Sequence, residues 1–239
     1  MIIPAKDEAS QIEAAVKSAA EANLILVVDG ESADETVLRA EATGARVITS
    51  RPGRARQLAA GVSEIEKWLA AGELEEVHQF DTFLFLHADT RLPAGFTIAM
   101  EKVLSDTGVV GGAFGFRFNL SEEVSSKSVT GFQRASLRLV EWGARLRNSC
   151  FGLAYGDQAI FIRPRVLAKF GGVPQVSMLE DLDLVSRLKR RGRFVVLSED
   201  IVTSARRYLD AGVWRTVARH ACLLTGYVFG MDRGEGRSE

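Results

Sequence analysis

An apolar run that stops at a carboxylate constrains the fold of this chain more than any other feature. Residues 82–86 read TFLFL, and HADT follows at 87–90. An uninterrupted apolar run is typical of a strand buried on both faces, as in a parallel sheet covered by helices. Asp89 is then expected at the carboxyl end of that strand, where open α/β sheets bind ligands. It either holds a metal ion bridged to phosphates or opens a turn before Pro93.

The composition is that of an ordinary globular protein with one large α/β domain. The chain has 239 residues, of which 46% are hydrophobic and 26% charged. Its formal net charge of −1 supplies no general field for a polyanion, so we predict no nucleic-acid partner. Cys150 and Cys222 form no CxxC pair, and the three histidines lack zinc-ligand spacing. With no membrane-spanning stretch and no signal-peptide pattern, we expect a cytoplasmic protein.

Strand and helix patterns alternate through residues 1–90. Strands are predicted at 1–3, 24–28 and 46–49, and the segments between them carry apolar residues at helical spacing. Ser32-x-x-Glu35 has the form of a capping box for the second helix, which Gly44 is expected to end. This alternation is typical of βαβ units, so we predict a parallel, nucleotide-binding half-sheet.

The pattern changes after Pro93. A helix is expected to run to Leu104, and residues 110–118 then alternate with period two. We predict a longer strand here, which could run antiparallel and so join a mixed sheet. Helices are predicted at 131–148 and 180–191, and strands at 158–162 and 194–197.

Two further carboxylates are expected near Asp89. Asp29 ends the second strand, where an acidic side chain either accepts hydrogen bonds from a nucleobase or ribose, or starts a turn with Gly30. Glu8 follows the first strand and either belongs to the same edge or interacts with the positive end of a helix. The shared edge expected for Asp29 and Asp89 favours ligand binding.

Arginines supply candidate groups for anion binding. Arg54 and Arg56 follow Gly53 in a predicted short loop, and the forked guanidinium donors match phosphate oxygens. A solvated basic turn explains them equally well. Arg206 and Arg207 follow a later strand and suit either phosphate or a solvated face.

Adjacent carboxylates begin the predicted helix at 180–191. Ser177-x-x-Glu180 fits a capping box, and the helix dipole stabilises acids in a first turn. Because Glu180 and Asp181 point in different directions, one can cap the helix while the other faces a cleft as a general base. The segment Gly156-Asp157-Gln158 either brings backbone close to a ligand or forms a turn.

Taken together, these residues resemble family 2 glycosyltransferases, which have the GT-A fold. Residues 2–9, IIPAKDEA, are similar to the opening strand and its Pro-x-x-Asn-Glu turn, and residues 27–32, VVDGES, to the second turn. Four segments resemble one bacterial subgroup more closely, the radical-SAM/selenodomain-associated transferases: GRARQ at 53–57, FLHADTRLP at 85–93, GDQAIF at 156–161 and ED at 180–181.

The resemblance implies an inverting hexosyltransferase that uses a nucleotide-diphospho-sugar donor, an acceptor hydroxyl and Mg²⁺ or Mn²⁺. Its GT-A domain, an α/β fold with a mixed, mostly parallel sheet flanked by helices, would span residues 1–208, with a C-terminal helix and tail at 209–239. Asp89 would bind the metal, and Asp181, beside Glu180, would deprotonate the acceptor. The nucleotide would contact Pro4, Ala5, Glu8, Asp29, Arg54, Arg56 and Ala88. The diphosphate or acceptor would contact Gly156, Asp157, Gln158, Arg206 and Arg207.

Two positions depart from the family pattern. His87 stands where the metal motif usually begins with an acid, and Asp7 where an asparagine usually precedes Glu8. His87 either binds the metal, bonds a ribose or packs as a neutral imidazole. Two other functions stay open: a nucleotidyltransferase, disfavoured because residues 4–8 contain no glycine, and a nucleotide-sugar-binding regulatory protein without turnover.

The predicted helix at 213–231 combines apolar residues with Arg215, Arg219 and His220. It either packs on its own domain, lies on a membrane surface to serve a lipid-linked acceptor, or forms an oligomer face. A peripheral membrane location is therefore an alternative to a purely cytoplasmic one.

Overall fold

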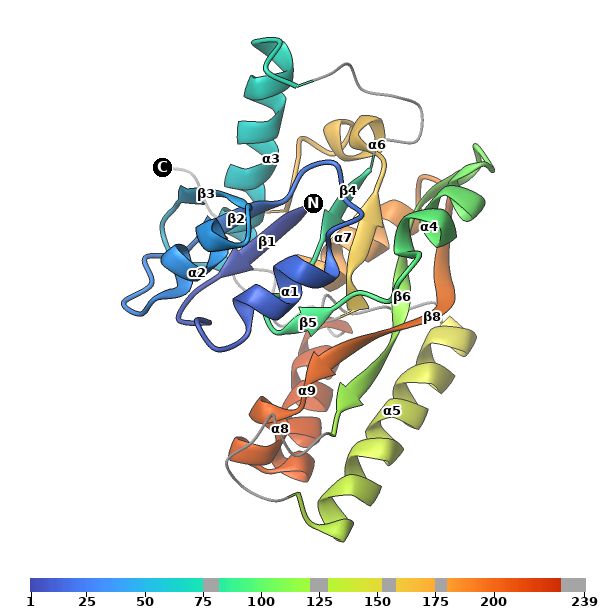
Figure 1. The fold of residues 1–239 in the computed structure, drawn as a ribbon. Helices are drawn as coiled ribbons and strands as arrows, with labels where there is room; N and C mark the ends of the chain where they lie inside the picture. Colours follow the sequence, from blue (N-terminus) through green and yellow to red (C-terminus); the bar gives the residue numbers. More distant parts are fainter. Residues whose placement is uncertain (75–81, 121–128, 152–157, 175–179, 229–239) are drawn as a thin grey trace, which may run out of the picture.

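The computed structural model describes residues 1–74, 82–120, 129–151, 158–174 and 180–228. Within these ranges, eight strands form one sheet in the order β3-β2-β1-β4-β7-β6-β8-β5 (Figure 1). Neighbours in the first half are parallel: β3 (Arg46–Thr49), β2 (Leu26–Asp29), β1 (Ile2–Ala5) and β4 (Phe83–Phe85). The predicted parallel half-sheet is confirmed.

Antiparallel pairing begins at β7 (Ile160–Ile162), which lies between β4 and β6 (Val109–Asn119) and is antiparallel to both. β6 is also parallel to β8 (Arg193–Ser204), and the short β5 (Thr90–Arg91) is antiparallel to β8. The sheet is therefore mixed and mostly parallel, as predicted. The strand expected at 194–197 is part of a much longer one.

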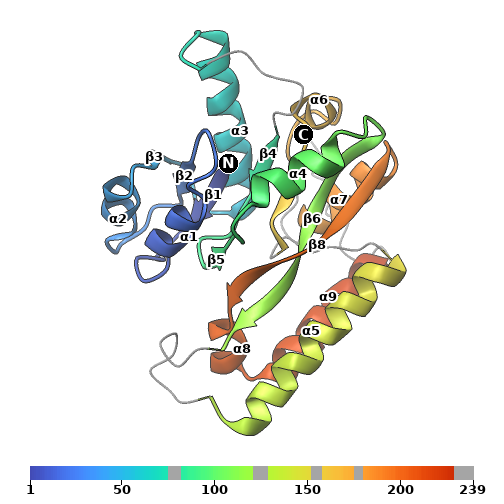
Figure 2. The ribbon, with the colours of Figure 1, turned by 45° about the vertical axis from the view of Figure 1, so that its right-hand side comes forward.

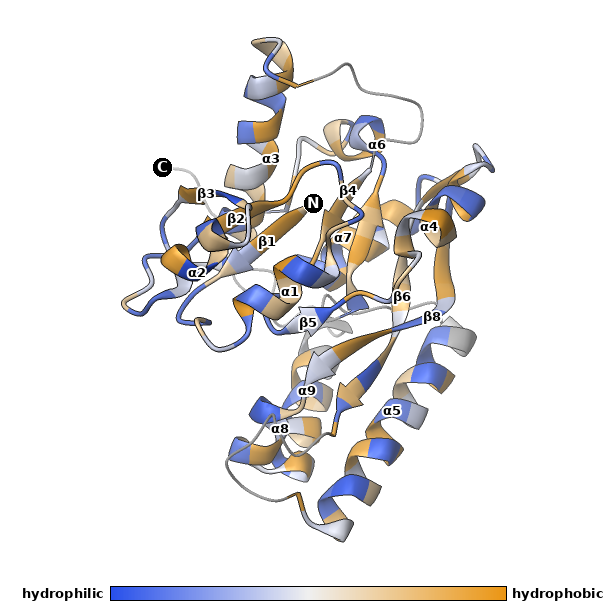
Figure 3. Cartoon of the chain, in the orientation of Figure 1, coloured by the Kyte–Doolittle hydropathy of each residue, from blue (hydrophilic) through white to orange (hydrophobic). Residues whose placement is uncertain are grey.

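Helices cover both faces of the sheet. α1 (Ile12–Ser18), α2 (Thr36–Ala42) and α4 (Phe96–Leu104) pack into one hydrophobic cluster. α3 (Arg54–Ala70), α6 (Pro164–Ala168) and α7 (Glu180–Lys189) pack into another on the opposite face. The strands between these two layers of helices are hydrophobic along most of their length (Figure 3), so both of their faces need to be covered. Strands buried on both sides read as continuous apolar runs, which explains the sequence pattern.

A separate group of helices lies beyond the ends of β6 and β8. We call α5 (Gly131–Phe151), α8 (Arg206–Ala211) and α9 (Val213–Val228) the lower lobe. α5 and α9 lie side by side in both ribbon views (Figures 1 and 2). Of the helices in the described ranges, none is both long and apolar enough to cross a bilayer.

Several local predictions were wrong. α2 begins at Thr36, and Glu35 caps it without a side-chain hydrogen bond, so Ser32 and Glu35 form no capping box. Ser32 instead accepts a hydrogen bond from the Asp7 amide, because the chain turns at Glu31 with a φ of 62° before the helix starts. Arg54 and Arg56 lie in the first turn of α3 rather than in a loop.

Other predicted positions differ by a few residues or cannot be compared. β4 ends at Phe85, so Asp89 lies in the connection between β4 and β5 rather than on the strand. The predicted C-terminal helix is α9, described to Val228. Ser177, Gly156 and Asp157 lie outside the described residues.

Close packing joins α3 to the sheet. A Cβ built on Gly61 would lie 2.7 Å from Ile2 Cγ2 and 3.0 Å from Val28 Cγ2. Gly61 therefore lets α3 approach β1 and β2 at a distance that a larger side chain would prevent. This approach brings the first turn of α3 to the carboxyl ends of the two strands.

Candidate functional site

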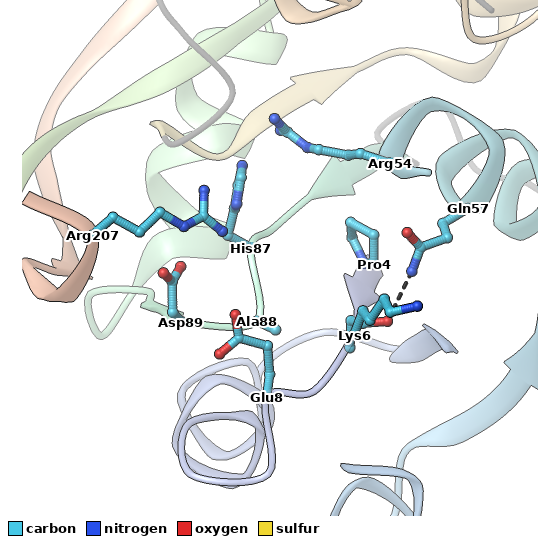
Figure 4. Close-up of a pocket in the computed structure, with 10 residues that line it drawn as sticks. Pro4, Lys6, Glu8, Arg54, Gln57, His87, Ala88, Asp89 and Arg207 are labelled. Atoms are coloured by element: carbon cyan, nitrogen blue, oxygen red, sulfur yellow. Dashed lines mark hydrogen bonds between the residues drawn. The ribbon is translucent and has the colours of Figure 1, made fainter. Parts of the chain in front are cut away.

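A cavity of about 300 Å³ lies at the carboxyl ends of β1 and β4 (Figure 4). It forms where the residues after both strands meet the first turn of α3 and the start of α8. Arg54, His87 and Arg207 extend toward the same space from three different elements (Figure 4). The lining residues are Pro4, Ala5, Lys6, Glu8, Arg54, Gln57, His87, Ala88, Asp89 and Arg207.

Gln57 holds the back of the cavity together. Its Nε2 donates hydrogen bonds to Ala5 O at 2.9 Å and to Val28 O at 2.8 Å, and the residue is 5% exposed. Gly30 allows this position, because a Cβ there would lie 2.9 Å from Gln57 Nε2. One buried amide thus fixes the ends of β1 and β2 relative to α3.

Asp29 lies beside this wall. It ends β2, opposite Ala5 in the ladder, and is 3% exposed. Its Oδ2 accepts a hydrogen bond from the Ser32 amide at 3.1 Å, whereas its buried Oδ1 has no hydrogen-bond partner among the described residues. A buried carboxylate oxygen left without a donor is costly, so Asp29 suits a ligand that brings a donor of its own.

Glu8 and Asp89 face the opposite side of the cavity, near α8. Glu8 Oε2 lies 2.7 Å from Arg206 Nη2, an ion pair that joins the first loop to the lower lobe. Burial raises the pKa of Glu8, and the nearby Asp89 charge adds to that shift while Arg206 opposes it. Two carboxylates in one small space favour a cation between or beside them.

Arg54 links the cavity to the start of α7. Its Nη1 lies 2.7 Å from Asp181 Oδ2 and 3.3 Å from Glu180 Oε1. Burial raises the pKa of Glu180, and the adjacent Asp181 charge raises it further against the attraction of Arg54. The first turns of α3 and α7 therefore face each other through one guanidinium and two carboxylates.

The structure brings together many of the residues expected to form a site. Pro4, Ala5, Glu8, Arg54, Ala88, Asp89 and Arg207 line the cavity. Three others are one ion pair away: Asp181 and Glu180 through Arg54, and Arg206 through Glu8. Lys6 and Gln57 also line it, although neither was expected to; Gln57 lies three residues after Arg54 on α3, at the spacing that places both on one helix face.

Two expected residues lie elsewhere. Arg56 does not belong to the described residues that line the cavity, and it is exposed to solvent. Gln158 is fully buried; its Nε2 donates to Phe114 O at 2.9 Å and its Oε1 accepts from Arg147 Nη2 at 3.3 Å. These bonds connect β6 and α5, which is a structural role.

The cavity offers a partial ligand set for a divalent cation. In the part of the chain that is described, no group of three or more His, Cys, Asp or Glu side chains is arranged to hold a metal. Asp89 and His87 nevertheless both line the cavity. Magnesium is usually bound through one or two carboxylates plus substrate phosphates and waters, so one carboxylate fits a metal carried with a diphosphate.

No protein-family model matches the sequence, and no curated protein is similar to it. Solved structures do match. Glucosyl-3-phosphoglycerate synthase from Mycobacterium tuberculosis, in complex with Mn²⁺, UDP and glucosyl-3-phosphoglycerate, is 18% identical, with a TM-score of 0.54, over 83% of this chain and 68% of that chain. The same enzyme with Mn²⁺, UDP-glucose and phosphoglyceric acid gives 18% and 0.55 over the same shares.

A third structure of that synthase, with Mg²⁺ and UDP, is 18% identical with a TM-score of 0.53 over 84% of this chain and 68% of that chain. At this level of identity the likeness establishes the fold. The chain has the GT-A fold, and the predicted fold class is confirmed.

Proposed function

We propose that this chain is a glycosyltransferase that moves a sugar from a nucleotide-diphospho-sugar to an acceptor hydroxyl. The observation that carries the proposal is the cavity itself, where Asp89 and the Arg54 guanidinium face one space and Asp181 contacts that guanidinium. The GT-A fold and the complexes of its structural neighbours with UDP-glucose support the same reaction class.

The donor is assigned to the cavity by charge. Lys6, Arg54 and Arg207 are cations that a diphosphate would contact, and Arg54 and Arg207 present forked donors suited to phosphate oxygens. The nucleoside would lie toward Asp29, whose Oδ1 can accept a hydrogen bond from a base or ribose. Pro4, Ala5 and Ala88 provide small or apolar walls beside it.

Asp89, with His87 as a second candidate, would hold a divalent cation. Such a cation, when bound, neutralises charge on the departing diphosphate. Arg54 and Arg207 stabilise the same charge from the protein side, in a partly enclosed space where electrostatic interactions are stronger than in water. This is the proposed basis for dependence on Mg²⁺ or Mn²⁺.

Asp181 is the proposed general base. A carboxylate that accepts the acceptor's proton while the acceptor oxygen attacks the sugar gives a single displacement with inversion. Arg54 Nη1 holds Asp181 by its Oδ2, and the same nitrogen lies 3.3 Å from Glu180 Oε1. A diphosphate that binds Arg54 would compete for it and leave Asp181 available for the acceptor.

The finer assignments rest on the sequence resemblance. We place the chain among the radical-SAM/selenodomain-associated transferases of family 2, with the transfer domain at 1–208 and a C-terminal helix and tail at 209–239. The boundary falls within α8, which carries Arg206 and Arg207. The acceptor stays general, a hydroxyl compound, with a lipid-linked one among the candidates, in a cytoplasmic or membrane-peripheral setting.

Thermal stability with nucleotides tests donor binding. UDP with Mn²⁺ should raise the melting temperature of the protein, and Asp89→Ala should lose that increase because the cation has no carboxylate. Glu66→Ala, at an exposed carboxylate of α3, is the matched control and should keep it. A melting temperature unmoved by any nucleoside diphosphate with Mn²⁺ would refute the proposed donor site.

Donor turnover tests the base. Asp181→Asn should lower the rate of sugar transfer or donor hydrolysis by about 10²- to 10⁴-fold while nucleotide binding persists. Asp183→Asn, two residues along α7 and paired with Arg187 at 2.8 Å, should retain turnover. Tight nucleotide binding by the wild-type protein without turnover over a broad acceptor panel would identify a regulatory protein instead.

A further inference from the structure

The side of α5 that faces away from the sheet carries four large apolar side chains that are exposed to solvent. They are Phe132, Leu139, Trp142 and Leu146, with exposed fractions of 73%, 51%, 61% and 49%. Their spacing of seven, three and four residues places them in one line along the helix. We call these four residues the outer stripe; it is about 21 Å long at the rise of an α-helix.

The outer stripe is not needed to attach α5 to the protein. Leu137 and Ala144, on the other side of the helix, are buried in the core, and Glu141 Oε1 accepts a hydrogen bond from the Phe118 amide at 2.6 Å. α5 thus has two apolar faces, of which only the inner one is covered by described residues. In Figure 3, hydrophobic and hydrophilic residues alternate along the ribbon of α5. A contiguous apolar strip of this kind marks an interaction surface.

The lower lobe is strongly basic. α5, α8 and α9 together contain eight arginines, no lysine and two acidic residues, whereas the whole chain has a net charge of −1. The positive charge is therefore concentrated here and the remainder of the protein is acidic. Arg138 and Arg145, seven residues apart, run along one edge of the outer stripe, since Arg138 precedes Trp142 by one turn. Both arginines are exposed, and Arg145 also pairs with Asp200.

We infer that the outer stripe docks on an anionic bilayer surface. A helix with Trp, Phe and Leu on one face and arginines beside them has the form of an interfacial helix, which inserts its apolar side among the headgroups while its cations meet anionic lipid. A second copy of the chain fits less well, because two such faces would bring their arginine rows together.

This surface differs from the one expected from the sequence. The C-terminal helix was a candidate membrane or oligomer face, with packing on its own domain as the alternative. Among the side chains that the structure describes, the exposed aromatic and leucine residues are mostly on α5. α9 lies next to α5 (Figure 2) and carries the exposed residues Trp214, Arg215 and Arg219, of which Trp214 is 48% exposed. The inference concerns where the protein resides and is independent of the proposed sugar transfer.

Co-sedimentation with vesicles tests the inference. The full chain should bind vesicles of equal parts phosphatidylcholine and phosphatidylglycerol, bind phosphatidylcholine alone at least tenfold more weakly, and lose affinity as salt is added. The Leu139→Ser, Trp142→Ser double variant and the Arg138→Glu variant should each weaken binding about tenfold, through lost insertion and reversed charge respectively.

Matched controls exist on the acidic part of the protein. Leu38 and Ile98 are 65% and 70% exposed on α2 and α4, so Leu38→Ser, Ile98→Ser removes as many apolar side chains elsewhere and should leave binding unchanged. Arg190→Glu, at an exposed position, is the charge control. Circular dichroism should show that all the variants keep the fold of the wild-type protein.

Three outcomes would overturn the inference. The first is equal binding, or none, to anionic and neutral vesicles. The second is loss of binding in the controls as large as in the outer-stripe variants. The third is a dimer in light scattering that Leu139→Ser, Trp142→Ser converts to a monomer, which would make the stripe an interface between copies. Tryptophan emission supplies a direct readout: with Trp68 and Trp214 replaced by Phe, Trp142 should shift to shorter wavelength on anionic vesicles.

Discussion

Arg54 Nη1 lies 2.7 Å from Asp181 Oδ2, although the two residues are 127 positions apart in the sequence. Both side chains are mostly buried, with exposed fractions of 25% and 16%. The guanidinium that faces the cavity is thus the same group that neutralises the proposed base. Ligand binding and base availability are coupled through a single side chain.

Replacing Arg54 tests how much this ion pair stabilises the fold. Arg54→Met leaves Glu180 and Asp181 adjacent and uncompensated, so we expect the free energy of unfolding to fall by about 1–3 kcal/mol. Lys67→Met, which breaks the exposed Lys67–Glu64 pair on the same helix, should cost less than about 1 kcal/mol. Urea unfolding measures both. Equal losses in the two variants would contradict the structural role assigned to Arg54.

Glu180 gives a pH-dependent prediction. Because its folded-state pKa is raised, mainly by burial, the ionised carboxylate is disfavoured in the folded protein. Its contribution to stability is therefore most favourable below the unfolded pKa of about 4.3 and is lost as pH rises through the higher folded pKa. Glu180→Gln should be more stable than the wild type at neutral pH, and this gain should shrink toward pH 4. Unfolding measured over that range checks the sign, and a difference that stays constant with pH refutes it.

Gln57 should be sensitive to any change of its amide. Gln57→Leu removes two buried hydrogen bonds and should lower the free energy of unfolding by about 1–3 kcal/mol. Gln57→Glu should cost more at neutral pH, because a carboxylate would face two carbonyl oxygens, and the loss should lessen in acid as it becomes protonated. Gln133→Leu, at an exposed cap, is the control for the residue type. Unfolding by denaturant at two pH values separates these cases.

Two helical glycines should respond oppositely to alanine. Gly61→Ala would place a methyl group 2.7 Å from Ile2 Cγ2 and should destabilise the protein by about 1–3 kcal/mol. Gly143→Ala, on α5, meets no heavy atom within 4 Å and should stabilise it by about 0.5–1 kcal/mol through helix propensity. Thermal unfolding compares the pair, and a Gly61→Ala variant as stable as the wild type or more so would show that α3 is not tightly packed on the sheet.

Arg163 is a buried structural cation. Its side chain donates to Val109 O at 2.8 Å and also bonds Leu104 O, so it satisfies carbonyl groups between the end of α4 and the start of β6. Arg163→Met should cost about 3 kcal/mol because these buried carbonyls lose a charged donor. Arg165→Met, two residues later and exposed, should change stability by less than about 0.5 kcal/mol. Guanidinium chloride would screen surface charges, so urea is the better denaturant.

The parallel half of the sheet was predictable because its signals are local. An apolar run followed by Asp29 or Asp89 reports a buried strand and its ligand edge, and the helical spacing between strands reports the crossovers. The start of α2 was not predictable in the same way. Ser32 bonds the Asp7 amide, a partner 25 positions away, and that competing bond removes it from the expected capping box.

The site was predictable in part for the same reason. Asp89 could be placed near the end of a strand, whereas Arg54 was expected in a loop rather than at the start of α3. Its pairing with Asp181 depends on how α7 packs against α3. The role of Gln57 was not predicted, because the sequence does not distinguish a buried, hydrogen-bonded glutamine from one on the surface. The outer stripe on α5 shows another limit: a helix was predicted there, but the sequence does not show whether its apolar residues are covered or exposed.

The ion pair between Glu8 and Arg206 spans 198 positions of the chain. Glu8 follows β1, and Arg206 lies at the beginning of α8, after all the strands in the described part of the chain. The parallel strands can therefore assemble while translation continues, but the cavity has no wall on the α8 side until that helix has been synthesised. In a nascent chain the parallel half-sheet of β1 to β4 is therefore complete well before α8, the helix that lets the protein enclose a small molecule.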